Sequence, residues 1–175
     1  VYDNLYDKFK DIESQYNKPN SLQIPSVSSI VKDHKGRLWV GTDGGGIDLI
    51  HPKNKQFTHI NSSNNKEFSG LLSDYIPTLF IDSKQNLWAG SWDKGIFFLK
   101  KDTNHFVNYN TENTNGTIRS NGIMSFSEST DGTIWIAAYN NGLHSYDPIS
   151  KQFTHYATES FINNGVQDGN AWKVL

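Results

Sequence analysis

The sequence predicts an all-β protein, a β-propeller fragment of about three and a half four-stranded blades, each 47–49 residues long. First, three segments align without a gap: DHKGRLWVGTDGGGIDLIHPKNKQFTHI, DSKQNLWAGSWDKGIFFLKKDTNHFVNY and STDGTIWIAAYNNGLHSYDPISKQFTHY. Second, each copy contains four short apolar runs separated by turn residues. Third, the chain is rich in aromatic, glycine and β-branched residues, which favours strands and tight turns over helices.

The repeat is defined by residues at fixed distances from a tryptophan. Trp39, Trp88 and Trp135 lie 49 and 47 residues apart. A glycine follows each tryptophan by seven residues and a phenylalanine by eighteen, and apolar residues precede it by nine and by twelve. These positions are Gly46, Gly95 and Gly142; Phe57, Phe106 and Phe153; Ile30, Leu79 and Phe126; Val27, Ile76 and Ile123.

Each repeated residue type suggests a structural role. We expect the tryptophan to lie between neighbouring sheets, where burial of its ring contributes roughly 2–3 kcal/mol. The glycine should supply a backbone conformation or a close approach that a Cβ atom would forbid. We expect the phenylalanine to pack the outer strand onto the next blade.

Four strands are expected in each complete copy, in an order typical of a propeller blade. The first strands are 27–33, 76–82 and 123–129, the second are 38–42, 87–91 and 134–138, the third are 46–51, 95–100 and 142–147, and the fourth are 56–60, 105–109 and 152–156. Polar turns follow the first strands, and short loops ending in the repeated glycine follow the second.

The two ends of the chain keep the same register. Tyr2 and Phe9 are seven residues apart, as are Tyr146 and Phe153, and the closing NAWKVL repeats the spacing of a first strand. The predicted organisation is one partial propeller over 1–175. It comprises the end of a preceding blade (1–21), three complete blades (22–70, 71–117 and 118–165) and the first strand of another (166–175). We therefore expect a fragment of a larger ring.

Composition and charge exclude several classes of function. The formal net charge is -2, from 16 basic and 18 acidic residues, so no nucleic-acid partner is predicted. The absence of cysteine excludes disulfides, cysteine zinc sites and thiol nucleophiles. No run of about 18 apolar residues predicts a membrane-spanning helix, and no signal peptide is visible. No motif for catalysis, phosphate binding or metal binding occurs, so we predict no enzyme activity, cofactor or metal.

Variable loops indicate where a ligand would bind. In a four-stranded antiparallel blade, the loop between strands two and three and the link between blades lie at the same end. Both vary among the copies here, and variable loops on a rigid scaffold are where binding is expected. The candidate ligand-binding residues in these loops are Asp43; Trp92, Asp93 and Lys94; and Tyr139, Asn140 and Asn141.

These residue types suit a sugar. An exposed ring offers a flat apolar face for C–H stacking, and Asp or Asn can bond to hydroxyl groups. The competing interpretation is that Trp92 packs on an adjacent loop and that Asn140 and Asn141 are turn residues that tolerate left-handed conformations. His59 and His155 recur at one repeat position, which favours a structural role over metal binding.

The pattern of an apolar strand, DxxGxLWVGT and then GGI, repeated at just under fifty residues, resembles the two-component regulator propeller repeat. DHKGRLWVGTDGGGIDLI fits closely, whereas in the other copies Gln85 replaces the turn glycine, Ala137 replaces the glycine after the tryptophan, and the aspartate has moved to Asp131. The resemblance implies the periplasmic sensor domain of hybrid histidine kinases of Bacteroidetes. In such proteins two seven-bladed propellers precede a β-sandwich, a membrane helix and the kinase, and they detect breakdown products of polysaccharides.

The resulting expectation is a non-catalytic, periplasmic sensor segment of an inner-membrane protein that binds an oligosaccharide. Its expected partners are that oligosaccharide, the rest of the sensor kinase, and a second copy of the chain through open blade edges. The alternative is a scaffold for protein or dimer contacts with no small ligand in this segment. The first reading predicts that Trp92 and Tyr139 are exposed and face one cleft, and the second predicts that they are buried between loops.

Overall fold

The computed structural model describes residues 2–3, 8–9, 12, 14, 18–63, 67–156 and 170–175. This part of the chain is built from strands and contains no helix, and thus no helix that could cross a membrane. The strands form three four-stranded antiparallel sheets and one two-stranded sheet, which confirms the predicted all-β fold. The predicted boundary between residues 165 and 166 lies outside the described residues.

Each four-stranded sheet is one blade, with its strands in sequence order. Blade 1 comprises β3 (Val27–Lys32), β4 (Leu38–Thr42), β5 (Ile47–Ile50) and β6 (Phe57–Ile60). Blade 2 comprises β7 (Thr78–Ile81), β8 (Leu87–Gly90), β9 (Ile96–Leu99) and β10 (Phe106–Tyr109). Blade 3 comprises β11 (Ile123–Glu128), β12 (Ile134–Ala138), β13 (Gly142–Asp147) and β14 (Gln152–Tyr156).

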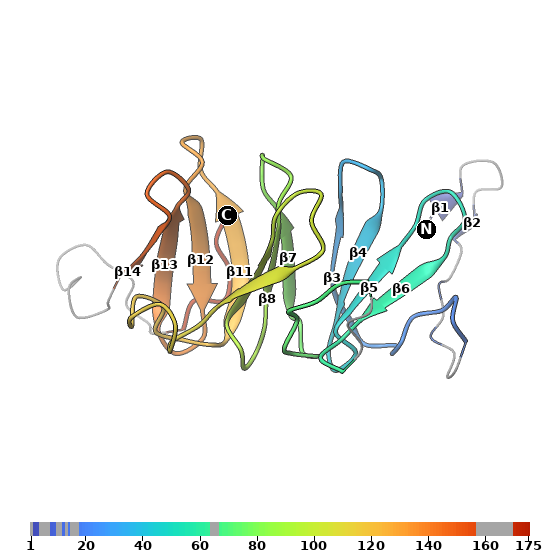
Figure 1. Ribbon diagram of the computed structural model, residues 1–175, viewed down its shortest axis with the longest axis horizontal. Coiled ribbons are helices and arrows are strands. Elements are labelled where there is room, and N and C mark those ends of the chain that lie inside the picture. Colours follow the sequence, from blue (N-terminus) through green and yellow to red (C-terminus); the bar gives the residue numbers. More distant parts are fainter. Residues whose placement is uncertain are drawn as a thin grey trace.

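The three blades stand beside one another along the long axis of the molecule (Figure 1). The first strands are the points of contact, because β3 lies against β7 and β7 lies against β11. The remaining strands, β1 (Tyr2–Asp3) and β2 (Lys8–Phe9), pair Tyr2 with Phe9, which is the register in which Tyr146 pairs with Phe153. The chain therefore forms an arc of blades with the first strands on the inside.

Tryptophans fill the space between consecutive blades. Trp39 and Trp88 are almost completely buried, and Trp88 packs against Phe126 and Tyr146 of blade 3, with ring centroids 6.1 and 5.1 Å apart. Trp39 and Trp88 thus pack onto the blade that follows, between neighbouring sheets as the sequence predicts. Trp135 is only half-buried and packs on Tyr156 of its own blade.

The repeated phenylalanine packs in the opposite direction from the one expected. Phe106 belongs to the cluster around Trp39, and the ring of Phe153 lies 5.1 Å from that of Tyr109, so both side chains face the preceding blade. Strand register gives the reason. Phe57 pairs with Ile50, and Ile50 pairs with Leu38, so these three side chains share one face of the sheet. Leu38 is adjacent to Trp39 in β4. Because successive side chains of a strand point to opposite faces, the phenylalanine and the tryptophan cannot share a face.

The glycine at the end of the second loop is required for both reasons that were predicted. Gly46 and Gly95 have φ angles of +76° and +80°. A Cβ atom on either would lie 2.3 Å from a carbonyl oxygen of the fourth strand, that of Ile60 or Tyr109. Gly142 has a φ of +65° with more room around it, since its nearest such oxygen would be 3.7 Å away.

Residues 170–175 follow blade 3 along the path that β11 takes beside blade 2. The backbone N–H of Ala171 donates to the carbonyl of Ala138 at 3.2 Å, as that of Ile123 donates to the carbonyl of Ser91 at 2.8 Å. No strand is assigned within this segment. Its position brings residues that are distant in sequence to the loop end of blade 3.

Candidate functional site

The blades have two ends of different character. The turns between strands one and two and between strands three and four lie at one end, which we call the turn face. The loops between strands two and three and the links between blades lie at the other, which we call the link face (lower end in Figure 1). All seven ligand-binding residues predicted from the sequence lie in loops of the link face.

Three aromatic side chains form a row along the link face. Trp92, Tyr139 and Trp172 are exposed to 41%, 37% and 58% respectively. The rings of Trp92 and Tyr139 meet edge to face, with centroids 6.1 Å apart, and those of Tyr139 and Trp172 do so at 5.6 Å. We call these three residues the aromatic row. It extends from the loop of blade 2 across that of blade 3 to the C-terminal segment.

Backbone hydrogen bonds fix the loops that carry the row. The N–H of Trp92 donates to the carbonyl of Tyr75 at 3.2 Å, and that of Tyr139 donates to the carbonyl of Gly122 at 2.8 Å. A Cβ atom on Gly122 would lie 3.2 Å from the Cβ of Tyr139, so glycine allows this close approach. The N–H of Asn140 donates to the side-chain oxygen of Asn170 at 3.0 Å. The first two bonds attach each loop to the segment that leads into the first strand of its own blade, and the third attaches the loop of blade 3 to the C-terminal segment.

Some of the predicted polar residues are exposed to solvent, and others form hydrogen bonds within the fold. Asp43 and Lys94 are exposed, as is Asp93, whose Oδ1 accepts a 2.6 Å hydrogen bond from the Ser73 hydroxyl. Asn140 is exposed and has a φ of +66°, which fits its reading as a turn residue. The backbone carbonyl of Asn141 contacts Nε2 of His155 at 3.0 Å, so this part of Asn141 holds the blade together.

Trp172 is the residue that sequence reasoning missed. It lies in the segment whose spacing predicts a first strand, and its position in the repeat is occupied by Ser28, Pro77 and Met124 in the other copies. Tyr75 is a second exposed ring of the link face, and it immediately precedes Ile76 at the start of a first strand. An aromatic residue at the entry of a first strand is the signal that could have identified both.

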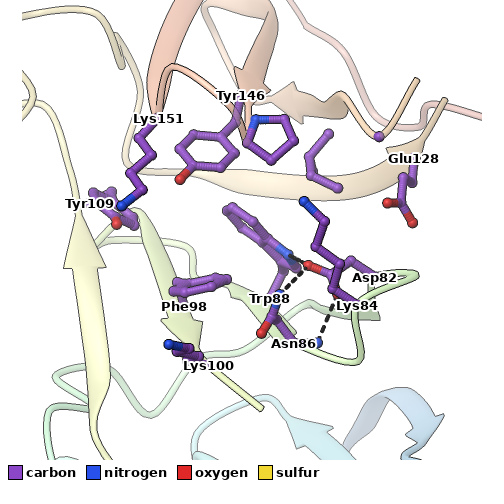
Figure 2. Close-up of a pocket in the computed structure, with 13 residues that line it drawn as sticks. Asp82, Lys84, Asn86, Trp88, Phe98, Lys100, Tyr109, Glu128, Tyr146 and Lys151 are labelled. Atoms are coloured by element: carbon purple, nitrogen blue, oxygen red, sulfur yellow. Dashed lines mark hydrogen bonds between the residues drawn. The ribbon is translucent and has the colours of Figure 1, made fainter. Parts of the chain in front are cut away.

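A groove of about 280 Å³ lies at the opposite end of the blades, on the turn face between blades 2 and 3 (Figure 2). Its walls come from both blades and include the indole of Trp88 and the ring of Tyr146. None of the seven predicted residues lines it. The aromatic row and this groove are therefore separate features of the arc.

Histidines take structural positions. Nδ1 of His59 lies 2.6 Å from a carboxylate oxygen of the fully buried Asp48. His144 is buried, and burial, reinforced by the nearby positive charges of His155 and Arg119, lowers its pKa to about 4. Within the described ranges, no three His, Asp or Glu side chains are grouped in a way that could hold a metal ion.

Comparison with known proteins identifies the repeat. The family described as the two component regulator propeller matches residues 21–44 and 70–93. Histidine kinase P4 of Formosa agariphila is 30% identical over 161 residues, which cover 88% of this chain and 11% of that protein. The chain thus spans about a tenth of the length of this relative.

Solved structures with the same fold come from sensors and from an enzyme. The extracellular domain of BT3049 from B. thetaiotaomicron, assigned to a hybrid two component system, is 24% identical with a TM-score of 0.69, over 81% of this chain and 18% of that one. Virginiamycin B lyase of Staphylococcus aureus is 18% identical with a TM-score of 0.55, over 75% and 41%. These likenesses show the propeller fold. The two segments that match the two component regulator propeller family lie in blades 1 and 2, and blade 3 repeats their pattern.

Proposed function

We propose that this chain is a non-catalytic segment of the extracytoplasmic sensor of a two-component histidine kinase and that it binds an oligosaccharide on its link face. The observation that carries the proposal is the aromatic row. Three exposed rings from consecutive blade positions stand 6.1 and 5.6 Å apart, centre to centre. Rings presented in a row offer apolar surface to successive sugar units of a chain.

The polar surroundings of the row support a sugar over an apolar ligand. Asp93 and Lys94 are exposed beside Trp92, and Asn140 is exposed beside Tyr139. These side chains provide acceptors and donors for hydroxyl groups at the edges of the stacked rings. Grouped exposed aromatic residues on a soluble surface also mark an interaction site, since isolated apolar side chains are the ordinary case.

The relatives support the sensor role. One relative is named a histidine kinase, and the BT3049 domain is described as extracellular. A propeller segment in such a protein has the rest of the kinase as its covalent partner. The sensor reading places this segment outside the cytoplasmic membrane, in the periplasm of a bacterium with two membranes.

Calorimetric titration of the 175-residue chain with a panel of plant and host oligosaccharides tests the proposal. We expect saturable binding to one class of sugar, weakened about tenfold by Trp92→Ala, which corresponds to ~1.4 kcal/mol of lost stacking and burial. Val107→Ala is the matched control, because Val107 has the same 41% exposure but lies on the outer strand β10. It should leave the affinity unchanged.

The alternative function, a scaffold for protein contacts, gives a different outcome. In that case the folded chain binds no member of the panel, or Trp92→Ala and Val107→Ala bind the sugar equally well. Either result would contradict an oligosaccharide site in the aromatic row.

A further inference from the structure

The groove on the turn face has an aromatic floor. The indole of Trp88 lies 4.7 Å from the ring of Phe98 and 5.1 Å from that of Tyr146, measured between centroids, so rings from blades 2 and 3 line it together. Tyr109 adds a fourth ring (Figure 2). Burial raises the pKa of Tyr109 and of Tyr146, so both hydroxyl groups remain protonated near neutral pH. Trp88 and Tyr146 are buried, so the apolar surface of the groove comes from the partly exposed rings of Phe98 and Tyr109, and the tyrosine hydroxyl of Tyr109 is a neutral hydrogen-bond donor.

The corresponding junction between blades 1 and 2 shows what fills such a groove. There the guanidinium of Arg37 lies 5.2 Å from the ring centroid of Trp39, and its Nε donates to Asp33 at 2.7 Å. The position of Arg37 in the repeat is occupied by Asn86 in blade 2. Asn86 has no guanidinium to place beside the tryptophan of its own blade, which is only 1% exposed, and its side-chain nitrogen donates to Asp82 at 2.9 Å.

Comparison of the two junctions also explains why Lys84 has no ion-pair partner among the described residues. Lys35 of blade 1 forms an ion pair with Asp102 of blade 2, with Nζ and Oδ1 2.5 Å apart. Lys84 is the repeat equivalent of Lys35, but the equivalent of Asp102 is Ile149, a neutral and exposed side chain. Lys84 extends into the groove in Figure 2, and no described carboxylate forms an ion pair with it.

The other charged groups of the groove leave it positive. Lys100 and Lys151 also line it, and neither forms an ion pair with the described residues. The two carboxylates are already engaged. Asp82 accepts from the indole N–H of Trp88 at 2.9 Å, and Glu128 accepts from the backbone and hydroxyl of a serine in the blade 2 turn at 2.6 and 2.7 Å. The lining therefore carries three ammonium groups and two carboxylates, a net charge of +1, and none of the three lysines forms an ion pair with a described carboxylate.

We propose that the groove between blades 2 and 3 on the turn face binds a small ring-shaped molecule that carries a carboxylate or sulfate group. The ring lies against the aromatic floor and the anionic group contacts the lysines. A volume of about 280 Å³ is near the lower limit for small-molecule sites, which suits one ring or two. This second site shares no residue with the aromatic row and does not depend on the function proposed for that row.

Matched pairs of probes test the chemistry. The 175-residue chain is titrated with glucuronate and glucose, and separately with 4-hydroxybenzoate and 4-hydroxybenzyl alcohol, while the indole N–H signal of Trp88 is followed by NMR. We expect the signal to shift saturably with an anionic probe, at a millimolar dissociation constant or below, and not with its neutral counterpart. The pair that responds distinguishes a sugar ring from an aromatic ring. Equal binding of a neutral counterpart, or no saturation with either anion, overturns the proposal.

Two substitutions copied from the neighbouring junction sharpen the test. Ile149→Asp recreates the partner of Lys84 and should weaken anion binding by about three- to tenfold, whereas Lys101→Gln, on a lysine outside the groove, should leave it unchanged. Asn86→Arg should abolish binding because the longer side chain occupies the groove, although it adds a positive charge. If Asn86→Arg binds the anion as well as the natural chain or better, the attraction is a property of surface charge alone and the groove is not a site.

Discussion

The buried His144 gives the fold a pH dependence whose size can be calculated. Its side chain is 1% exposed, and Nε2 accepts a 3.2 Å hydrogen bond from the backbone N–H of Arg119. The accepting nitrogen carries no proton, so the proton of the neutral ring is on Nδ1. That atom has no hydrogen-bond partner among the described residues. Protonation would place a second N–H and a charge in a buried site.

The sign and the magnitude follow from the two pKa values. Burial lowers the pKa of His144 from the ordinary 6.5 to about 4 in the folded protein. Well above pH 6.5 neither state binds the proton, and this contribution to stability is fully present. As pH falls below 6.5 the unfolded chain takes up a proton that the folded chain refuses. The free energy of unfolding therefore falls by about 2 kcal/mol between pH 7 and pH 5, and by about 3 kcal/mol near pH 4.

His144→Gln isolates this contribution, because glutamine keeps an acceptor for Arg119 and does not titrate. Urea unfolding of both proteins at pH 7 and pH 5 measures the difference. We expect the natural chain to lose about 2 kcal/mol more than the variant over this interval. Equal losses in the two proteins would show that His144 does not remain neutral in the fold, and the reasoning would fail.

Three further predictions concern the packing of the blades. Gly95→Ala should lower the free energy of unfolding by about 2 kcal/mol or more, because it adds a Cβ atom 2.3 Å from a carbonyl oxygen. Gly116→Ala should cost about 1 kcal/mol, because Gly116 has a similar positive φ but open space around it. Thermal unfolding of the two variants measures the difference. Asp82→Ala should cost about 2–3 kcal/mol in urea unfolding, since it leaves the buried indole N–H of Trp88 without its acceptor; a cost near zero would contradict this role. Because Trp135 is only half-buried on the outer face of blade 3, we expect the chain to self-associate through that face, and a mass in light scattering that is independent of concentration would count against it.

Much of the fold follows from the sequence because its signals are local. The predicted strand 38–42 is β4 as observed, and the strand predicted at 76–82 is β7, which is shorter at both ends. Alternating apolar residues and turn residues act over a few positions, so strand limits can be predicted without knowing what lies opposite. The conformation of Gly46 was predictable for the same reason, since a recurring glycine at a loop end indicates a positive φ or a close approach.

The candidate sites depend more on tertiary structure. The sequence placed Trp92 and Tyr139 in loops at one end of the blades, and the structure shows both rings exposed and in contact. It did not indicate Trp172, which reaches Tyr139 only because residues 170–175 pass beside blade 3. No local pattern reports a contact between residues that are over thirty positions apart.

The sequence by itself thus determined the number of blades, their strands and the end at which the variable loops meet. Tertiary structure decided which neighbour each side chain touches. Register, and not composition, turns Phe106 toward the preceding blade while Trp88 faces the following one. On the turn face a groove lies beside Asn86, whereas the guanidinium of Arg37, at the same repeat position, lies over the ring of Trp39. Such outcomes depend on side-chain length and on the distance between two sheets, and both are fixed only when the blades pack together.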